Sequence, residues 1–112
     1  MDIRGVKTVE ALARFSGNVE RYRHWILEFV EFGPTAVEEI KAAIMVKDRD
    51  KAMHLTHGLK GRAAMLGMSE IQSIASLLEL ALRKDQPSDL WLGELEETCT
   101  EVVQEVQRTL GS

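Results

Sequence analysis

The alternation of apolar and polar residues along this chain follows the period of an α-helix. Apolar positions recur three and four residues apart over four long stretches, and this pattern predicts four amphipathic helices. Alternation at the two-residue period of a strand is never sustained, and the β-branched residues also fall at helical spacing. The stretches cover residues 19–44, 51–66, 69–82 and 88–110. We therefore expect an all-α protein.

The stretch 19–44 is interrupted by a break, and helix-boundary signals precede and follow it. Gly33-Pro34 interrupts the apolar pattern, so residues 19–44 form either one kinked helix or two helices. Asn18 is a favourable N-cap for the helix that follows it. An Asp in the polar turn 47–50 is expected to cap the next helix.

The N-terminal part of the chain predicts a smaller element. Residues 8–15 are expected to form a short helix with Val9 and Leu12 facing inward, and Gly17 closes it. Residues 1–6 are expected to be a flexible lead-in.

The remaining boundary signals complete the fold prediction. Gly67 ends the helix 51–66, Ser69 caps the next helix, and the last helix opens at Ser88. A chain of 112 residues can bury one core without disulfides. We predict a single domain over residues 1–112: an antiparallel four-helix bundle with a short additional N-terminal helix.

The helix 51–66 places a histidine opposite its apolar stripe. With Leu59 at the centre of the buried face and about 100° of rotation per residue, His57 lies about 160° away and faces water. Lys60 and Gly61 follow three and four residues later, so both lie beside the imidazole. Gly61 destabilises the helix by about 1 kcal/mol relative to alanine. A glycine at this position therefore indicates that another molecule must approach the helix backbone closely. The stripe itself comprises Ala52, Leu55, Leu59, Ala63 and Leu66.

This group of residues fits phosphoryl chemistry. A neutral imidazole is nucleophilic near pH 7, and an adjacent ammonium can pair with phosphoryl oxygens. The pattern resembles the phosphoacceptor helix of histidine-containing phosphotransfer (HPt) domains, which runs His-x-x-Lys-Gly, then small residues and Leu-Gly. Arg62 departs from it, because many relatives carry a small residue there, and this difference bears on the choice of partner. The matching residues are His57, Lys60, Gly61, Ala63, Ala64, Leu66 and Gly67, with further similarity at 12–18, Tyr22, Phe29 and Leu78-Glu79-x-Ala81.

The resemblance implies a phosphorelay intermediate. His57 would accept a phosphoryl group from the aspartyl-phosphate of a response-regulator receiver domain and pass it to another receiver aspartate, while Lys60 stabilises the charged group. In related domains the position of Glu79 often carries Glu or Gln directed at the active histidine. Glu79 could accept the Nδ1 proton of His57 or pair with Lys60, and an ordinary surface glutamate is the alternative. The receiver docking surface would comprise Met53, His54, Gly61 and Ala64.

Charge, hydropathy and cysteine content limit the classes of partner and the cellular compartment. A net charge of −4 without clustered Lys and Arg argues against nucleic-acid binding. No apolar run is long enough to span a bilayer and no signal-like segment opens the chain, so we expect a cytoplasmic domain without membrane contact. Cys99, the single cysteine, fits a reducing compartment and a core position.

Nucleotide chemistry is not expected of this chain. It contains neither a glycine-rich nucleotide loop nor an acidic cluster suited to Mg²⁺, so it should need no cofactor and have no ATP site. Mg²⁺ is expected on the partner receiver. A sensor histidine kinase, a second expected partner, could belong to the same polypeptide as part of a hybrid kinase.

The two other histidines and the helical scaffold allow further interpretations. His54 lies one turn before His57 and is also exposed, but no lysine follows it three residues later. A metal site at these two histidines is disfavoured because both point outward and lack Glu-x-x-His partners, so no metal is expected. His24 fits a solvated surface residue. A non-catalytic helical interaction module with a degenerate site is the competing function.

Overall fold

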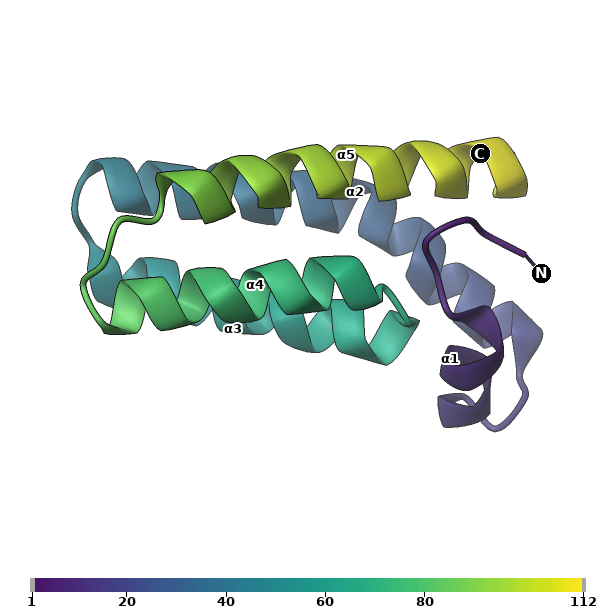
Figure 1. Cartoon of the computed structure of the whole chain (residues 1–112). Helices are drawn as coiled ribbons and strands as arrows, with labels where there is room; N and C mark the ends of the chain where they lie inside the picture. Colours follow the sequence, from purple (N-terminus) through teal and green to yellow (C-terminus); the bar gives the residue numbers. More distant parts are fainter. Residues whose placement is uncertain (1, 112) are drawn as a thin grey trace.

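The bundle is built from helices whose apolar faces meet in one core. The computed structural model describes residues 2–111, and within them the chain forms helices and no strand. The helices are α1 (Thr8–Arg14), α2 (Val19–Met45), α3 (Arg49–Leu66), α4 (Ser69–Arg83) and α5 (Asp89–Leu110). Helices α2 to α5 run antiparallel along the long axis of a 40 × 23 × 17 Å molecule, and α1 lies at one end (Figure 1). The predicted four-helix bundle with a short N-terminal helix is confirmed.

Helix α3 occupies a position between two neighbours. It packs against α2 on one side and α4 on the other, while α5 closes the bundle against α2 and α4. The outer face of α3 therefore stays open to solvent. The core comprises mainly Tyr22, Ile26, Phe29, Ile40, Leu59, Leu66, Met68, Ile71, Leu78, Leu95 and Val106.

Helix α2 continues through Gly33-Pro34, which decides between the two possibilities left open by the sequence. Pro34 is exposed inside the helix, so its ring projects into solvent and meets no neighbour in the core. Gly33 is buried where α2 approaches α5. A β-carbon there would lie 2.6 Å from the Phe29 ring and 3.0 Å from Cys99 Sγ, so this glycine permits the close packing of the two helices.

Two of the predicted caps are confirmed and one is wrong. The side chains of Asn18 and Asp48 accept hydrogen bonds from the third residue after each of them. Met68 rather than Ser69 is the N-cap of α4, and it makes no side-chain cap hydrogen bond. The left-handed backbone of Gly67 (φ 80°) turns the chain, so the cap position falls on Met68, one residue before the predicted Ser69. Met68 itself lies in the core. Ser88 precedes α5 as expected but provides no side-chain cap bond.

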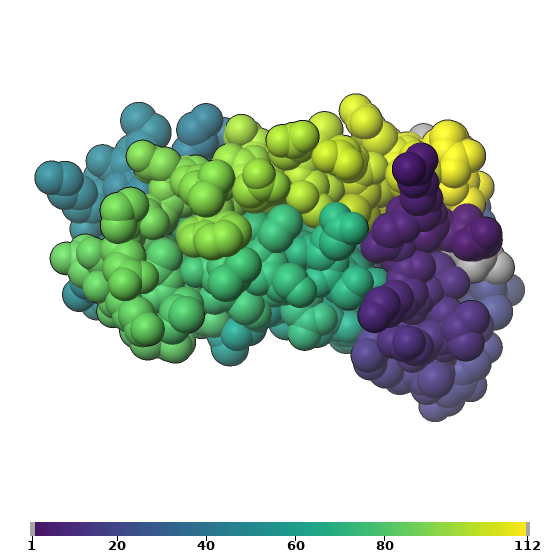
Figure 2. Space-filling model, viewed as in Figure 1, coloured from purple at the N-terminus to yellow at the C-terminus, as the bar shows by residue number. Residues whose placement is uncertain are grey.

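The N-terminal segment is packed, which corrects the predicted flexible lead-in for residues 2–6; Met1 lies outside the described residues. Ile3 is only 1 % exposed, and its carbonyl accepts a hydrogen bond from the backbone of Val6. The segment crosses the end of the bundle near the end of α5 (Figure 2). The Lys7 N–H donates to the Gly67 carbonyl (2.8 Å), which ties this segment to the α3–α4 turn.

The orientation of α1 also differs from the prediction. Val9 is 84 % exposed, whereas Ala11 is fully buried and Leu12 is half-buried. Ala11 faces the α3–α4 turn, where a β-carbon on Gly67 would lie 3.1 Å from its own. The small side chain of Ala11 suits this close contact, so the helix turns its larger Val9 outward.

Tyr22 and Cys99 are titratable side chains buried in the core. The Tyr22 hydroxyl donates to the Leu66 carbonyl (2.9 Å) and satisfies a free acceptor at the end of α3. Burial raises the pKa of Tyr22 to about 12, against the lowering effect of Arg14. Cys99 is buried in the core as predicted, and burial raises the pKa of its thiol to about 11. It is therefore an inert core residue.

Candidate functional site

Helix α3 separates an apolar inner face from an open outer face. Ala52, Thr56, Leu59, Ala63 and Leu66 are buried, close to the predicted stripe. Thr56 takes part because its hydroxyl donates to the Ala52 carbonyl (2.7 Å), while Leu55 is only half-buried. The side chain of His57 is 67 % exposed on the opposite face, as the helical angle predicted.

Glu79 brings α4 into the site. Its carboxylate is only 9 % exposed, yet one oxygen lies 3.0 Å from His57 Nδ1 and the other accepts a hydrogen bond from Lys60 Nζ at 2.7 Å. The antiparallel return of the chain at Gly67 places the middle of α4 beside the middle of α3. Both of the roles considered for Glu79 are therefore present at once, and the ordinary surface glutamate is excluded by its burial.

The charge of Glu79 is fixed by these two contacts. Burial alone would raise the pKa of its carboxyl, but the hydrogen bond and charge of Lys60, together with those of His57, hold it below its ordinary value. Glu79 is thus a carboxylate at neutral pH. A carboxylate only accepts hydrogen bonds, so the shared hydrogen is carried by His57 Nδ1.

This arrangement selects one tautomer of the imidazole. With the hydrogen on Nδ1, a neutral His57 keeps its lone pair on Nε2, the other ring nitrogen. The high exposure of the ring leaves it accessible from solvent. The site therefore presents a nucleophilic nitrogen, oriented from behind by a buried carboxylate, with an ammonium next to it.

Arg83 is a member of this cluster that the sequence analysis did not single out. Its guanidinium lies 3.7 Å from Glu79 Oε2, one turn further along α4, so the carboxylate is surrounded by His57, Lys60 and Arg83. The i, i+4 spacing from Glu79 was the available signal. It could be used only once Glu79 was known to face the histidine.

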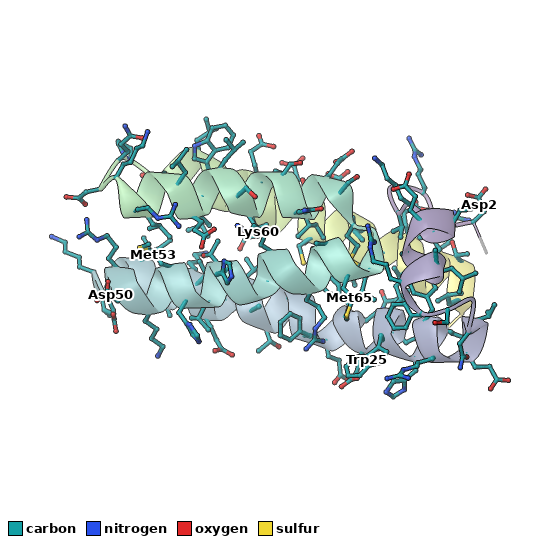
Figure 3. All side chains as sticks on the ribbon, turned by 90° about the horizontal axis from the view of Figure 1, so that it is seen from below. Asp2, Trp25, Asp50, Met53, Lys60 and Met65 are labelled. Carbon is teal, nitrogen blue, oxygen red and sulfur yellow. The ribbon has the colours of Figure 1, made fainter. Side chains whose placement is uncertain are left out.

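The other residues proposed from the sequence lie around His57. On α3, Met53 and Lys60 lie on the side toward α4, whereas Met65 lies on the side toward α2, where Trp25 is located (Figure 3). Gly61 is exposed, and apart from its chain neighbours and the backbone of its own helix, a β-carbon there would meet no atom of the described residues within 4 Å. Its lack of a side chain has no explanation within the folded domain.

His54 does not join the cluster around Glu79. It lies in a groove on the α2 side, where the lining includes Glu28, Glu31 and Glu39. Ala64 is half-buried, and its carbonyl accepts a hydrogen bond from Arg14 (2.9 Å). His24 is a solvated surface residue that pairs with Glu28 at 3.4 Å, as expected. Over residues 2–111, no group of three or more His, Cys, Asp or Glu side chains is arranged to hold a metal ion.

The comparisons with known proteins agree with this fold. The family model for the Hpt domain matches residues 24–110. The chain therefore belongs to the Hpt domain family, whose general role is phosphotransfer in phosphorelays. It is also similar to the crystal structure of the HPT domain from an Hpt sensor hybrid histidine kinase of Shewanella, with a TM-score of 0.82 and 22 % identity over 98 % of this chain and 97 % of that one. No match was found among curated proteins. In the described part of the chain, none of the helices is long and apolar enough to cross a membrane.

Proposed function

We propose that His57 is the phosphoacceptor of this domain. It takes a phosphoryl group from the aspartyl-phosphate of one receiver domain and passes it to the aspartate of another. The observation that carries this proposal is the 3.0 Å contact between His57 Nδ1 and the buried Glu79 carboxylate, which leaves Nε2 free on an exposed ring. His54, the other histidine on α3, has no such partner within the described residues.

The transfer step balances on these atoms. The Nε2 lone pair attacks phosphorus, the N–P bond forms, and the P–O bond to the receiver aspartate breaks to release its carboxylate. The ring then carries a phosphoryl group on Nε2 and a hydrogen on Nδ1, so it is an imidazolium. The Glu79 carboxylate stabilises this positive charge, and the reverse step on a second receiver returns the ring to its neutral state.

Lys60 and Arg83 provide positive charge on either side of Glu79. Lys60 uses one of its three N–H groups on Glu79, so the other two remain for phosphoryl oxygens. When Lys60 turns toward the phosphoryl group, Arg83 can keep the carboxylate paired. Mg²⁺ is expected on the receiver, beside its aspartate, and no cofactor on this chain. A sensor histidine kinase, in the same polypeptide or a separate one, is the expected source of the phosphoryl group.

The receiver is expected to dock over the open face of α3. Met53, His54, Gly61 and Ala64 surround His57, and the bare backbone at Gly61 lets a partner approach the helix closely. A non-catalytic interaction module would use the same surface without covalent chemistry.

The test is incubation of the chain with a ³²P-phosphorylated receiver domain. We expect label that is stable to base and labile to acid, as an N–P bond requires. A receiver that binds without transferring label would favour the interaction module.

A further inference from the structure

We propose that a basic groove on the α2 side of α3 binds an acidic segment of the receiver that docks on His57, and that Arg62 determines which receivers fit. The groove lies between α1, α2 and α3 and is lined by Arg14, Arg21, Arg62, Phe15, Trp25 and Met65, among others. This inference rests on the proposed function. It adds a recognition site that does not take part in the phosphoryl chemistry.

Arg62 is held in place by aromatic rings. Its guanidinium carbon lies 4.3 Å from the centre of the Phe32 ring and 5.4 Å from that of Trp25, both on α2. Cation–π contacts use the flat faces of the guanidinium and leave its N–H edge available for a planar carboxylate. The side chain is therefore ordered before a partner arrives, which lowers the entropy cost of binding.

The groove is positively charged although the whole chain is negative. Its lining includes three arginines and no carboxylate, whereas the net charge of the chain is −4. Over residues 2–111, neither Arg21 nor Arg62 forms an ion pair with an acidic side chain. Arg14 is anchored by its bond to the Ala64 carbonyl. The charge of the groove is thus left uncompensated and favours an anionic partner.

The groove lies close enough to His57 to be covered by a receiver that docks there. Arg62 is five residues beyond His57 on the same helix, about 7.5 Å further along the axis. A standard interface covers about 800 Å² on each partner, so a receiver centred on His57 also covers this groove. The adjacent groove carries Glu28, Glu31 and Glu39, which would repel an extended polyanion such as a nucleic acid. A short acidic segment on a docked receiver can enter the basic groove without extending over the acidic one.

The kinetic experiment measures phosphoryl transfer to His57 against receiver concentration, using the receiver that labels the chain fastest in a purified panel. For the double variant Arg21→Gln/Arg62→Gln we expect the half-saturating receiver concentration to rise about tenfold, with the rate at saturation changed by less than about twofold. The effect should shrink from about 50 mM to about 500 mM salt. Arg62→Lys keeps the charge without the stacked plane and should lie between the two. Arg4→Gln/Lys41→Gln removes two charges elsewhere and should behave like the parent.

A second measurement reports whether the groove is covered. The chain contains two tryptophans, Trp25 in the groove and Trp91 on α5, so 5-fluorotryptophan labelling gives two ¹⁹F signals. We expect addition of the receiver to shift the Trp25 signal and leave the Trp91 signal unchanged.

The possible failures are distinguishable. If no receiver labels the parent chain, the proposed function is wrong, and this inference falls with it. If the parent is labelled but the double variant shows the same half-saturating concentration, or if Trp25 does not respond to a receiver that transfers phosphate, the groove is not part of the docking surface while His57 remains the phosphoacceptor. Circular dichroism of each variant establishes that it is folded.

Discussion

The two flanks of α3 treat their cationic side chains differently. On the α4 flank, Lys60 donates to a buried carboxylate at 2.7 Å, and the same carboxylate orients His57. On the α2 flank, Arg62 lies over aromatic rings, and no carboxylate of the described chain pairs with it. In the proposed function the first arrangement orients the phosphoacceptor nitrogen, and in the further inference the second presents charge to a receiver. Together the two proposals predict that transfer chemistry and receiver recognition can be changed independently on a single helix.

The central residue between the flanks should show the largest effect. His57→Gln removes the nucleophile, so we expect labelling by a phosphorylated receiver to be abolished, while the exposed position keeps the fold intact. His54→Gln is the matched control and should retain most of the labelling. Loss of label at His54→Gln with label preserved at His57→Gln would reverse the assignment.

Gly61 tests whether a partner approaches the outer face of α3. The space around it is open, so Gly61→Gln should fold normally and raise stability by up to about 1 kcal/mol, because most residues favour a helix more than glycine does. The added side chain should nevertheless slow transfer from the receiver by a large factor. Thermal melting and transfer rates check the two effects. An unchanged transfer rate would place the docking surface elsewhere.

Glu79→Gln tests the orientation of His57 from the α4 flank. The amide is similar in size but carries no charge and can present either an oxygen or an NH₂ group to Nδ1. We expect transfer to slow by about 10- to 100-fold at saturating receiver, the range typical of carboxylates that orient metal-ligating histidines in the same way. The receiver concentration at half-saturation should stay nearly constant, in contrast to the groove variants. A change confined to that concentration would assign Glu79 to docking.

Most of the scaffold could be predicted from the sequence, because a regular helix fixes the angles between its own residues. The exposure of His57 and the capping by Asn18 and Asp48 are local properties of this kind. Contacts between helices depend on rotation and register, which local periodicity does not define. For that reason the sequence could not predict that Glu79 pairs with His57 and Lys60 at the same time.

The errors lie where tertiary packing overrides local preference. Ile3 is buried because the segment before α1 crosses the end of the bundle, although its sequence has no helical pattern. Val9 is exposed because the tight contact at Gly67 accepts only the small Ala11. The stacking of Arg62 on Phe32 depends in the same way on how α2 packs against α3.

Lys60→Met separates charge from packing on the α4 flank. The methionine keeps most of the apolar stem, while the hydrogen bond to Glu79 and the charge beside the imidazole are lost. We expect a loss of about 1 kcal/mol in stability and a several-fold decrease in the rate of phospho-His57 formation or in its lifetime. Lys60→Arg restores the charge with a different geometry and should be intermediate. Transfer and retention equal to the parent would reduce Lys60 to a structural partner of Glu79.

The smallest expected effect is in acid stability, and it too differs between the flanks. The pKa of Glu79 in the folded protein is below its ordinary value of 4.5, because Lys60 and His57 together outweigh the effect of burial. A carboxyl with a lowered folded pKa contributes stability that is fully present above its unfolded pKa and is lost as the pH falls through its folded pKa. The parent should therefore exceed Glu79→Gln by about 1 kcal/mol at pH 7, and the difference should shrink steadily below about pH 4.5. Arg62→Gln involves no carboxylate partner, so its stability relative to the parent should be the same at pH 7 and pH 3. Denaturant unfolding at both pH values measures the two differences. A gap for Glu79→Gln that does not depend on pH would mean that its ion pairs contribute nothing to folding and that the α4 flank serves the chemistry alone.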